Sequence, residues 1–303
     1  MLHYTAVQWL FFFYFYCFFG WIFESAFVSL KSRHFVNRGF MRGPFLPIYG
    51  SGAIMMLVVS MPFQDNIFLT YLAGCIGATA LELVTGVTME ALFKVRYWDY
   101  SNQKFNYKGH ICLSSTVAWG FLTIFMTEYL HRLVERIVFA IPADLVNILT
   151  VVISVCIVSD FTLSFKAALD LRDVLMGLER AREEMERIQK RLDVLIAVAN
   201  DERELRKLER ENYVEDLMGS LEERFGRIKE RLSVDPGAFM EDVREELAEL
   251  RGKYLVEKEQ RMRFRRIKDF WQRNLIRGNP GMKSNRFGEA LEELKKMVDE
   301  RRK

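Results

Sequence analysis

Apolar residues run almost without interruption through five segments of the first 165 residues, separated by shorter polar stretches. The segments are 7–30, 45–61, 67–93, 111–130 and 145–165. A helix needs about 20 apolar residues to cross the hydrocarbon core of a bilayer, and a helix satisfies its own backbone where lipid offers no partner. The pattern therefore predicts an all-α, polytopic membrane helix bundle of about five spans. The second segment is short and contains glycines, so its ends are left open.

After residue 168 the pattern changes to a regular alternation of apolar positions three and four apart. This spacing is typical of a coiled coil. Its first seam consists of Leu171, Val174, Leu178, Ala181, Met185, Ile188, Leu192, Leu195 and Ala199. The seam resumes at 214–232 and, after "SVDPGAF", at 240–254. We predict a transmembrane domain at 1–168, cytoplasmic coiled-coil helices at 169–260 and a basic amphipathic segment at 261–303. The helices either fold back within the chain or pair with a second copy, which would give a homo-oligomer.

The charged residues of this 303-residue chain are also concentrated in its second part. Of the 83 Lys, Arg, Asp and Glu residues (43 and 40), 21 lie in residues 1–170 and 62 in residues 171–303. The first part is too apolar for an ordinary soluble domain, and the second is too charged for a membrane. The four cysteines lie in or beside apolar runs and form no C-x-x-C pair, so neither a disulfide framework, a metal site nor a cofactor is expected. A cleaved signal peptide is not expected either, because no basic region precedes the first apolar run.

Basic residues in the connectors predict the orientation. The first connector carries Lys31, Arg33, Arg38 and Arg42, and the third carries Lys94, Arg96, Lys104 and Lys108. The second connector, "PFQDN", has no basic residue. Because cytoplasmic connectors are enriched in Lys and Arg, we predict a multi-pass protein of the cell membrane with its N-terminus outside and its C-terminal tail in the cytoplasm.

The first and third connectors also share a rhythm of Glu, Asn and an aromatic-Gly pair. The rhythm matches Glu24 with Glu90, Asn37 with Asn106, and Tyr49-Gly50 with Trp119-Gly120. We predict a tandem, parallel duplication of a helical hairpin, a kind of repeat found in transporters. Chance similarity between two cytoplasmic loops is the alternative.

Four carboxylates, Glu24, Glu82, Glu90 and Asp160, lie within the apolar runs. An ionised carboxylate in the membrane is costly unless it pairs, is protonated or lines a wet cavity. We predict a polar cavity open to the cytoplasm, formed by Glu24, Asn37, Arg38, Arg42, Glu82, Glu90, Asp99, Asn106, His110 and Asp160. The alternative is structural pairing, for example of Glu90 with Arg38 or Arg42.

The stretch 261–277, "RMRFRRIKDFWQRNLIR", is strongly basic and places aromatic and aliphatic residues on one helical face. A basic amphipathic helix suits an anionic lipid surface, and a partner protein is equally open. Nucleic acid is not favoured, because the tail is tethered to a membrane. The predicted contact residues are Arg263, Phe264, Arg265, Arg266, Lys268, Trp271 and Arg273.

Four dense motifs occur in order: "NRGFMRGPFLPIYG", "LELVTGVTMEALF", "WDYS" and "FNYKGHICL". Together they resemble the bacterial ABC-transporter type IV (CmpB-like) family over residues 8–130, and "NLIRGNPGMKS" resembles a short C-terminal motif of some members. The long coiled tail is less typical. The resemblance implies a multi-pass permease with no established substrate. It implies shared-motif positions at Glu24, Asn37, Arg38, Gly39, Gly43, Pro44, Pro47, Tyr49, Gly50, Glu82, Glu90, Trp98, Asp99, Tyr100, Asn106 and Gly109.

These features predict a permease-like membrane transport component. The chain lacks the phosphate-binding motif G-x-x-x-x-G-K-[ST], so any ATPase would be a separate subunit. The alternative is a membrane-anchored scaffold or sensor acting through the coiled coil. An intramembrane enzyme using His110 or Cys112 is a third reading, but no nucleophile–base spacing supports it, and we do not expect an enzyme.

Overall fold

The computed structural model describes residues 4–208, 245, 248–250, 252–256, 258–259 and 270–300, without the side chains of 191–208 and of residue 300. The chain divides into two compact units, one formed by residues 1–175 and 267–303 and the other by residues 176–266. The first unit contains all the elements discussed below, apart from the part of the longest helix beyond Leu175.

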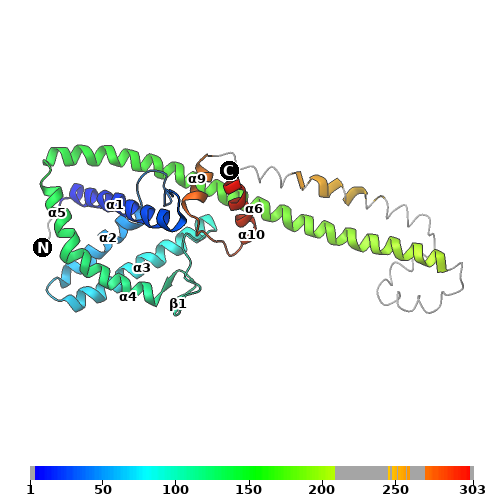
Figure 1. Cartoon of the computed structure of the whole chain (residues 1–303), viewed down its shortest axis with the longest axis horizontal. Coiled ribbons are helices and arrows are strands. Elements are labelled where there is room, and N and C mark those ends of the chain that lie inside the picture. Colours follow the sequence, from blue (N-terminus) through cyan, green and yellow to red (C-terminus); the bar gives the residue numbers. More distant parts are fainter. Residues whose placement is uncertain are drawn as a thin grey trace. The chain divides into compact units, whose positions relative to one another are not determined.

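Helices form nearly all of the regular structure (Figure 1). In chain order the elements are α1 (Ala6–Ser32), α2 (Pro47–Ser60), η1 (Met61–Phe63), α3 (Ile67–Phe93), β1 (Asn106–Tyr107), β2 (Ile111–Cys112), α4 (Leu113–Phe125), η2 (Met126–Leu130), α5 (His131–Phe139), α6 (Ala143–Leu208), α9 (Phe270–Gly278) and α10 (Gly288–Glu300). The two short strands form an antiparallel pair between α3 and α4.

Within the described residues, three helical stretches are long and apolar enough to cross a membrane: Ala6–Ser32, Ile67–Phe93 and Ala143–Lys190. Pro47–Phe63 is a shorter apolar helix. The predicted fourth segment falls on α4 and the π-helical turn η2, which continue directly into α5. The mostly helical membrane architecture is confirmed, and the count of five spans stays a prediction.

Local chemistry explains where the long helices begin and end. Thr5 caps α1 through a reciprocal pair of hydrogen bonds with Gln8, and the Asn66 side chain accepts from two backbone N–H groups at the start of α3. Such caps satisfy amides that the helix itself cannot pair. At the far ends, Arg33 and Lys94 both adopt left-handed backbone conformations, with φ of 55° and 60°. Each conformation stops the helix and turns the chain into a polar loop.

Small residues allow the helices of the bundle to approach closely. A Cβ added to Gly50 of α2 would lie 2.4 Å from the Cys17 Sγ of α1, and one added to Gly120 of α4 would lie 2.6 Å from the Cys75 Sγ of α3. A Cβ on Gly74 would lie 2.2 Å from Thr123 Oγ1. Larger side chains at these glycines would therefore separate α1 from α2 and α3 from α4.

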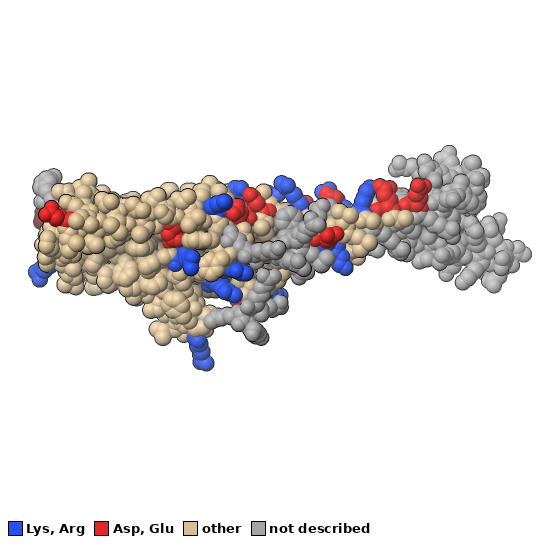
Figure 2. Space-filling view, turned by 90° about the horizontal axis from the view of Figure 1, so that it is seen from above, with Lys and Arg blue, Asp and Glu red and all other residues tan. Residues whose placement is uncertain are grey.

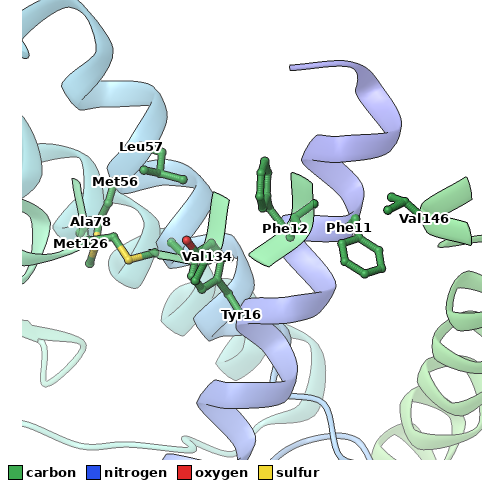
Figure 3. Packing of buried hydrophobic residues seen from close by; sticks show 11 residues of the cluster. Phe11, Phe12, Tyr16, Met56, Leu57, Ala78, Met126, Val134 and Val146 are labelled. Carbon is green, nitrogen blue, oxygen red and sulfur yellow. The ribbon is translucent and has the colours of Figure 1, made fainter. Parts of the chain in front are cut away.

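The main apolar core collects side chains from α1, α2, α3, η2, α5 and α6 (Figure 3). It contains Phe11, Phe12, Tyr16, Ala53, Met56, Leu57, Ala78, Met126, Val134, Val138 and Val146. Phe12 is fully buried. Because interiors pack to crystal-like density, this cluster fixes the relative positions of the helices.

A polar network lies beside this core. Both ring nitrogens of His131 contact tyrosine hydroxyls: Nδ1 is 2.8 Å from Tyr16 Oη, and Nε2 is 3.0 Å from Tyr4 Oη. Tyr4 donates its only proton to Glu135 at 2.6 Å. Tyr4 therefore accepts from Nε2–H of His131, and the contact between Nδ1 and Tyr16 places a second hydroxyl on the other ring nitrogen.

The outer surface of the bundle is largely apolar. Exposed side chains include Phe23, Ile76 and Val151, with exposed fractions of 65%, 72% and 64%. Figure 2 shows one face of the molecule, where uncharged side chains cover much of the helical bundle. In water such a surface would be unfavourable, so it supports the assignment of a membrane protein.

The helix α6 continues the fifth apolar segment into the predicted coiled coil without a break. Of the seam residues up to 190, Leu171, Leu178, Ala181 and Ile188 are buried, and Val174 and Met185 are half-buried. The side chains of Leu192, Leu195 and Ala199 and most of the later seam lie outside the described residues. The coiled coil, its partner and the predicted domain boundaries therefore stay predictions.

We expect Gly74→Ala to lower the thermal unfolding temperature of the detergent-solubilised protein. The new methyl group would overlap Thr123, which is fully buried, and such overpacking costs about 1–3 kcal/mol. Gly52→Ala is the matched control, because nothing lies within 4 Å of its added Cβ and alanine favours a helix interior. Equal unfolding temperatures for the two variants would contradict the close packing of α3 against α4.

Candidate functional site

The loop between α1 and α2 is folded back onto the end of α1. The Arg38 side chain lies there with its Nε 3.3 Å from Glu24 Oε1, and Tyr49 Oη donates to Glu24 Oε2 at 2.8 Å. Asn37 Oδ1 accepts from the Trp21 indole at 2.6 Å. Gly39 has a φ of +130°, which side chains rarely adopt. Residues of the first motif therefore fix this loop and neutralise the carboxylate at the end of the helix.

The loop between α3 and α4 holds a second ionic cluster. Glu90 Oε2 lies 2.9 Å from Arg96 Nε and 3.1 Å from His110 Nε2. The indole of Trp98 donates to the His110 carbonyl at 2.9 Å. Glu90 is ion-paired, as the alternative of structural pairing expects, but its partner is Arg96 and not Arg38 or Arg42. The local sequence supplies a partner six residues after Glu90, whereas Arg38 belongs to the α1–α2 loop and pairs with Glu24.

Asn106 and Gly109 shape the turn of this second loop. The Asn106 amide donates to the Gln103 carbonyl at 2.8 Å, and its oxygen accepts from the Gly109 N–H at 3.1 Å. Gly109 has a φ of +73°. Asn106 is exposed, so its hydrogen bonds hold the loop at the surface.

Glu82 is buried in the middle of α3 and accepts hydrogen bonds from three neutral groups. Tyr100 Oη donates to Oε1 at 2.9 Å, and Oε2 accepts from Trp119 Nε1 at 3.0 Å and Ser115 Oγ at 3.3 Å. No Lys, Arg or His in the described part of the chain forms an ion pair with it. Glu82 therefore differs from Glu24 and Glu90, whose charges are balanced by cations.

Asp160 of α6 belongs to a third group. Its Oδ2 accepts the Gly43 backbone N–H at 2.7 Å. Arg42, Phe45, Cys156, Asp160 and Trp271 line a cavity of about 310 Å³. Of the residues predicted to share one polar cavity, only Arg42 and Asp160 lie here. The others lie in the two loop clusters or around Glu82.

The C-terminal segment connects the two loops. Arg38 Nη1 donates to the Asn279 side chain at 2.9 Å and to the Gly278 carbonyl at 3.2 Å. The Asn279 amide donates in turn to the carbonyls of Gly39 and Leu275, at 2.8 and 2.9 Å. A Cβ on Gly278 would lie 2.6 Å from the Asn37 carbonyl. The α1–α2 loop therefore packs closely against Gly278 and forms hydrogen bonds with the Asn279 side chain.

The next residues of the C-terminal segment bind the second loop. The backbones of Lys283 and Arg96 exchange hydrogen bonds of 2.6 and 2.9 Å as an isolated antiparallel bridge. Ser284 Oγ donates to the Lys94 carbonyl at 2.7 Å. Met282 is fully buried between these polar contacts. The segment thus joins both loops within one compact unit.

An ion pair completes this contact. Lys283 Nζ lies 2.9 Å from Asp99 Oδ2. Burial raises the pKa of Asp99, but hydrogen bonds from Lys283 and from Ser101 outweigh that effect and lower the pKa to about 2. Asp99 is therefore ionised at neutral pH and holds Lys283 by charge as well as by the backbone bridge.

Sequence reasoning missed several of these residues. The predicted site did not include Asn279, Lys283, Tyr100 or Trp119. The resemblance of "NLIRGNPGMKS" to a C-terminal motif is the signal that points to the first two. Of the predicted surface-binding residues, Arg263, Phe264, Arg265, Arg266 and Lys268 lie outside the described residues. Trp271 and Arg273 lie on α9 and are half-buried.

We expect Asn279→Ala to destabilise the docked C-terminal segment. The change leaves the Gly39 carbonyl and the Arg38 guanidinium without this partner in a buried contact, and each such loss costs about 1–3 kcal/mol. Limited proteolysis should release residues after α9 faster than in the native protein. Asn147→Ala, on an exposed position of α6, is the control. Identical proteolysis of the Asn279→Ala variant and the control would contradict the contact.

Comparisons with known proteins agree with this reading of the motifs. No curated protein and no solved structure matches the chain. A family model described as "Putative ABC-transporter type IV" matches residues 11–165. This match covers half of the chain and spans the helices from α1 into α6, with both loop clusters. The chain is a member of this ABC-transporter type IV family of membrane proteins.

Proposed function

We propose that the chain is a permease-like subunit of a membrane transport system that works with a separate ATPase. The observation that carries the proposal is Glu82, a buried carboxylate inside a membrane-crossing helix whose partners are all neutral donors. An ionisable group in such a position is costly and marks a functional site by default. Membership of the transporter-related family supports the same assignment.

Contacts between α1 and α2 resemble contacts between α3 and α4, which supports an internal repeat of two helical hairpins. The residues that correspond between the two hairpins differ from those matched in the sequence. Glu24 accepts from Tyr49, and Glu82 accepts from Trp119. Seven residues before each glutamate, a cysteine contacts the glycine that follows the aromatic residue: Cys17 with Gly50, and Cys75 with Gly120. We therefore propose that Glu24 corresponds to Glu82, and not to Glu90.

In this proposal the two hairpins supply related carboxylates with different partners. Glu24 is balanced by Arg38, fourteen residues later in sequence. Arg96 stands at the same interval from Glu82 but pairs with Glu90. The second copy of the repeat is thus left with an acid that no cation neutralises within the described residues. This asymmetry suits a site where protonation or a bound cation changes during transport.

The scaffold or sensor function is the second candidate, and one observation favours it. In the described residues, Glu24 and Glu90 are ion-paired and Asp160 is bonded to a backbone amide. The cavity of about 310 Å³ lies beside the α1–α2 loop, and it does not include Glu82. Acids whose charges or hydrogen bonds are satisfied within the protein suit an anchor.

Purification of the full-length protein from native membranes tests the proposal. We expect an ATPase subunit to co-purify and to hydrolyse ATP, and we expect Glu82→Gln to lower that hydrolysis while preserving expression and assembly. Glu128→Gln, at an exposed i,i+4 pair with Arg132, is the matched control. Recovery of soluble helical partners in place of an ATPase would instead support the scaffold.

We also propose that the N-terminus is outside and that both polar loops and the C-terminal segment are cytoplasmic. The contacts between Arg38 and Asn279 and between Asp99 and Lys283 support a common side for all three.

Cysteine accessibility in a variant without native cysteines checks this topology. We expect labels at residues 33 and 103 to react from the cytoplasmic side and a label at residue 65 from the outer side. Reaction of residues 33 and 103 from opposite sides would contradict the proposed topology.

A further inference from the structure

The cavity beside the α1–α2 loop contains one positive and one negative side chain that do not pair with each other. It is lined by Arg42, Pro44, Phe45, Cys156, Asp160 and Trp271 and has a volume of about 310 Å³. In the described residues, neither Arg42 nor Asp160 forms an ion pair. Two opposite charges in one cavity without a mutual contact leave room for a ligand that carries both complementary charges.

Aromatic rings hold the positive group in place. The Arg42 guanidinium carbon lies 4.3 Å from the ring centre of Phe270 and 5.2 Å from that of Trp271. Such cation–π contacts orient a guanidinium without neutralising its charge. Arg42 is an exposed residue, and the planar geometry of its N–H groups suits a phosphate.

The negative group is fixed by one hydrogen bond. Asp160 Oδ2 accepts from the Gly43 N–H at 2.7 Å, and a Cβ on Gly43 would approach that oxygen to 3.0 Å. The second carboxylate oxygen of Asp160 has no partner in the described residues. That oxygen can accept from an ammonium group.

The remaining walls are apolar and continue onto the lipid-facing surface. Phe45 and Cys156 line the cavity. Val152 lies one helical turn before Cys156 on α6 and is 54% exposed. An acyl chain could follow this face into the membrane while a headgroup occupied the charged end. Tryptophan, here Trp271, is common at the level of lipid headgroups.

We propose that this cavity binds the headgroup of a zwitterionic phospholipid with a primary amine, such as phosphatidylethanolamine. Arg42 contacts the phosphate, Asp160 accepts from the ammonium group, and the acyl chains lie along the exposed apolar face of α6. The discrimination depends on the amine, because a trimethylated choline headgroup has no N–H to donate to Asp160. This inference does not depend on whether the protein transports a substrate.

The test is native mass spectrometry of the full-length protein in nanodiscs that contain equal amounts of ethanolamine, choline and glycerol phospholipids. We expect one retained ethanolamine lipid, favoured over the choline lipid by about tenfold, the size of effect that one charge-assisted hydrogen bond gives. Asp160→Asn keeps an acceptor for Gly43 but removes the charge, so it should abolish this preference. Arg42→Gln should reduce the retention of all three lipids.

Asp144→Asn and Lys31→Gln are the charge-matched controls, since both residues are exposed and absent from the cavity lining. We expect both to retain the ethanolamine preference, and we expect all four variants to keep the thermal stability of the native protein. Equal retention of ethanolamine and choline lipids by the native protein would overturn the proposal. Preferential retention of the glycerol lipid would overturn it in favour of general binding to an anionic surface. Displacement of the lipid by equimolar soluble glycerophosphoethanolamine would also overturn it.

Discussion

Carboxylates on apolar helices impose the main constraint on this fold, because lipid offers them no hydrogen-bond donors. Each of the four acids identified in the apolar runs finds a donor within the protein. Glu24 and Glu90 pair with arginines of the following loops, and Glu82 is satisfied by side chains from the α3–α4 loop and α4. Asp160 accepts from the α1–α2 loop. The loops therefore have to be folded for the membrane helices to be stable.

The C-terminal segment provides hydrogen-bond partners for backbone groups of the two polar loops. A loop that turns its backbone groups toward the protein leaves carbonyls and amides that need partners. Asn279 satisfies the Gly39 carbonyl, Ser284 satisfies the Lys94 carbonyl, and Lys283 pairs its backbone with Arg96. Arg38 is shared between Glu24 and Asn279. One guanidinium thus links a membrane helix, its loop and a segment 240 residues later in sequence.

Much of the fold could be predicted from the sequence because it follows from local patterns. The apolar run 67–93 coincides with α3, since Asn66 is a strong helix cap and Lys94 ends the helix. The docking of Asn279 on Arg38 could not be predicted in this way. Three of its four hydrogen bonds are accepted by backbone carbonyls, which leave no mark in the residue pattern. Leu275, which lies in the basic segment 261–277, is buried within the protein, and its burial depends on the same docking.

The sequence identified many residues of the candidate site, but it did not predict which of them contact one another. Glu82 and Trp119 are 37 positions apart, and only the crossing of α3 and α4 brings them together. The sequence matches Glu24 with Glu90 in the predicted repeat, because both glutamates precede a basic loop. The contacts of Tyr49 with Glu24 and of Trp119 with Glu82 support instead the match of Glu24 with Glu82 that we propose. The spacing of residues within a loop does not show which turn of the preceding helix contacts the next helix. The glutamates that correspond in the two hairpins can therefore be identified only from three-dimensional contacts.

Two covalent connections join the two compact units of the chain. In sequence, the unit formed by residues 176–266 is inserted between the two parts of the other unit, residues 1–175 and 267–303. Covalently, it is connected through α6 on one side and through the chain that enters α9 on the other. The α9 end leads directly to Gly278 and Asn279, which contact Arg38. A displacement of α9 would therefore change the hydrogen bonds that Arg38 donates to Gly278 and Asn279. The ion pair of Arg38 with Glu24 is made between α1 and the loop that follows it, so it does not depend directly on α9.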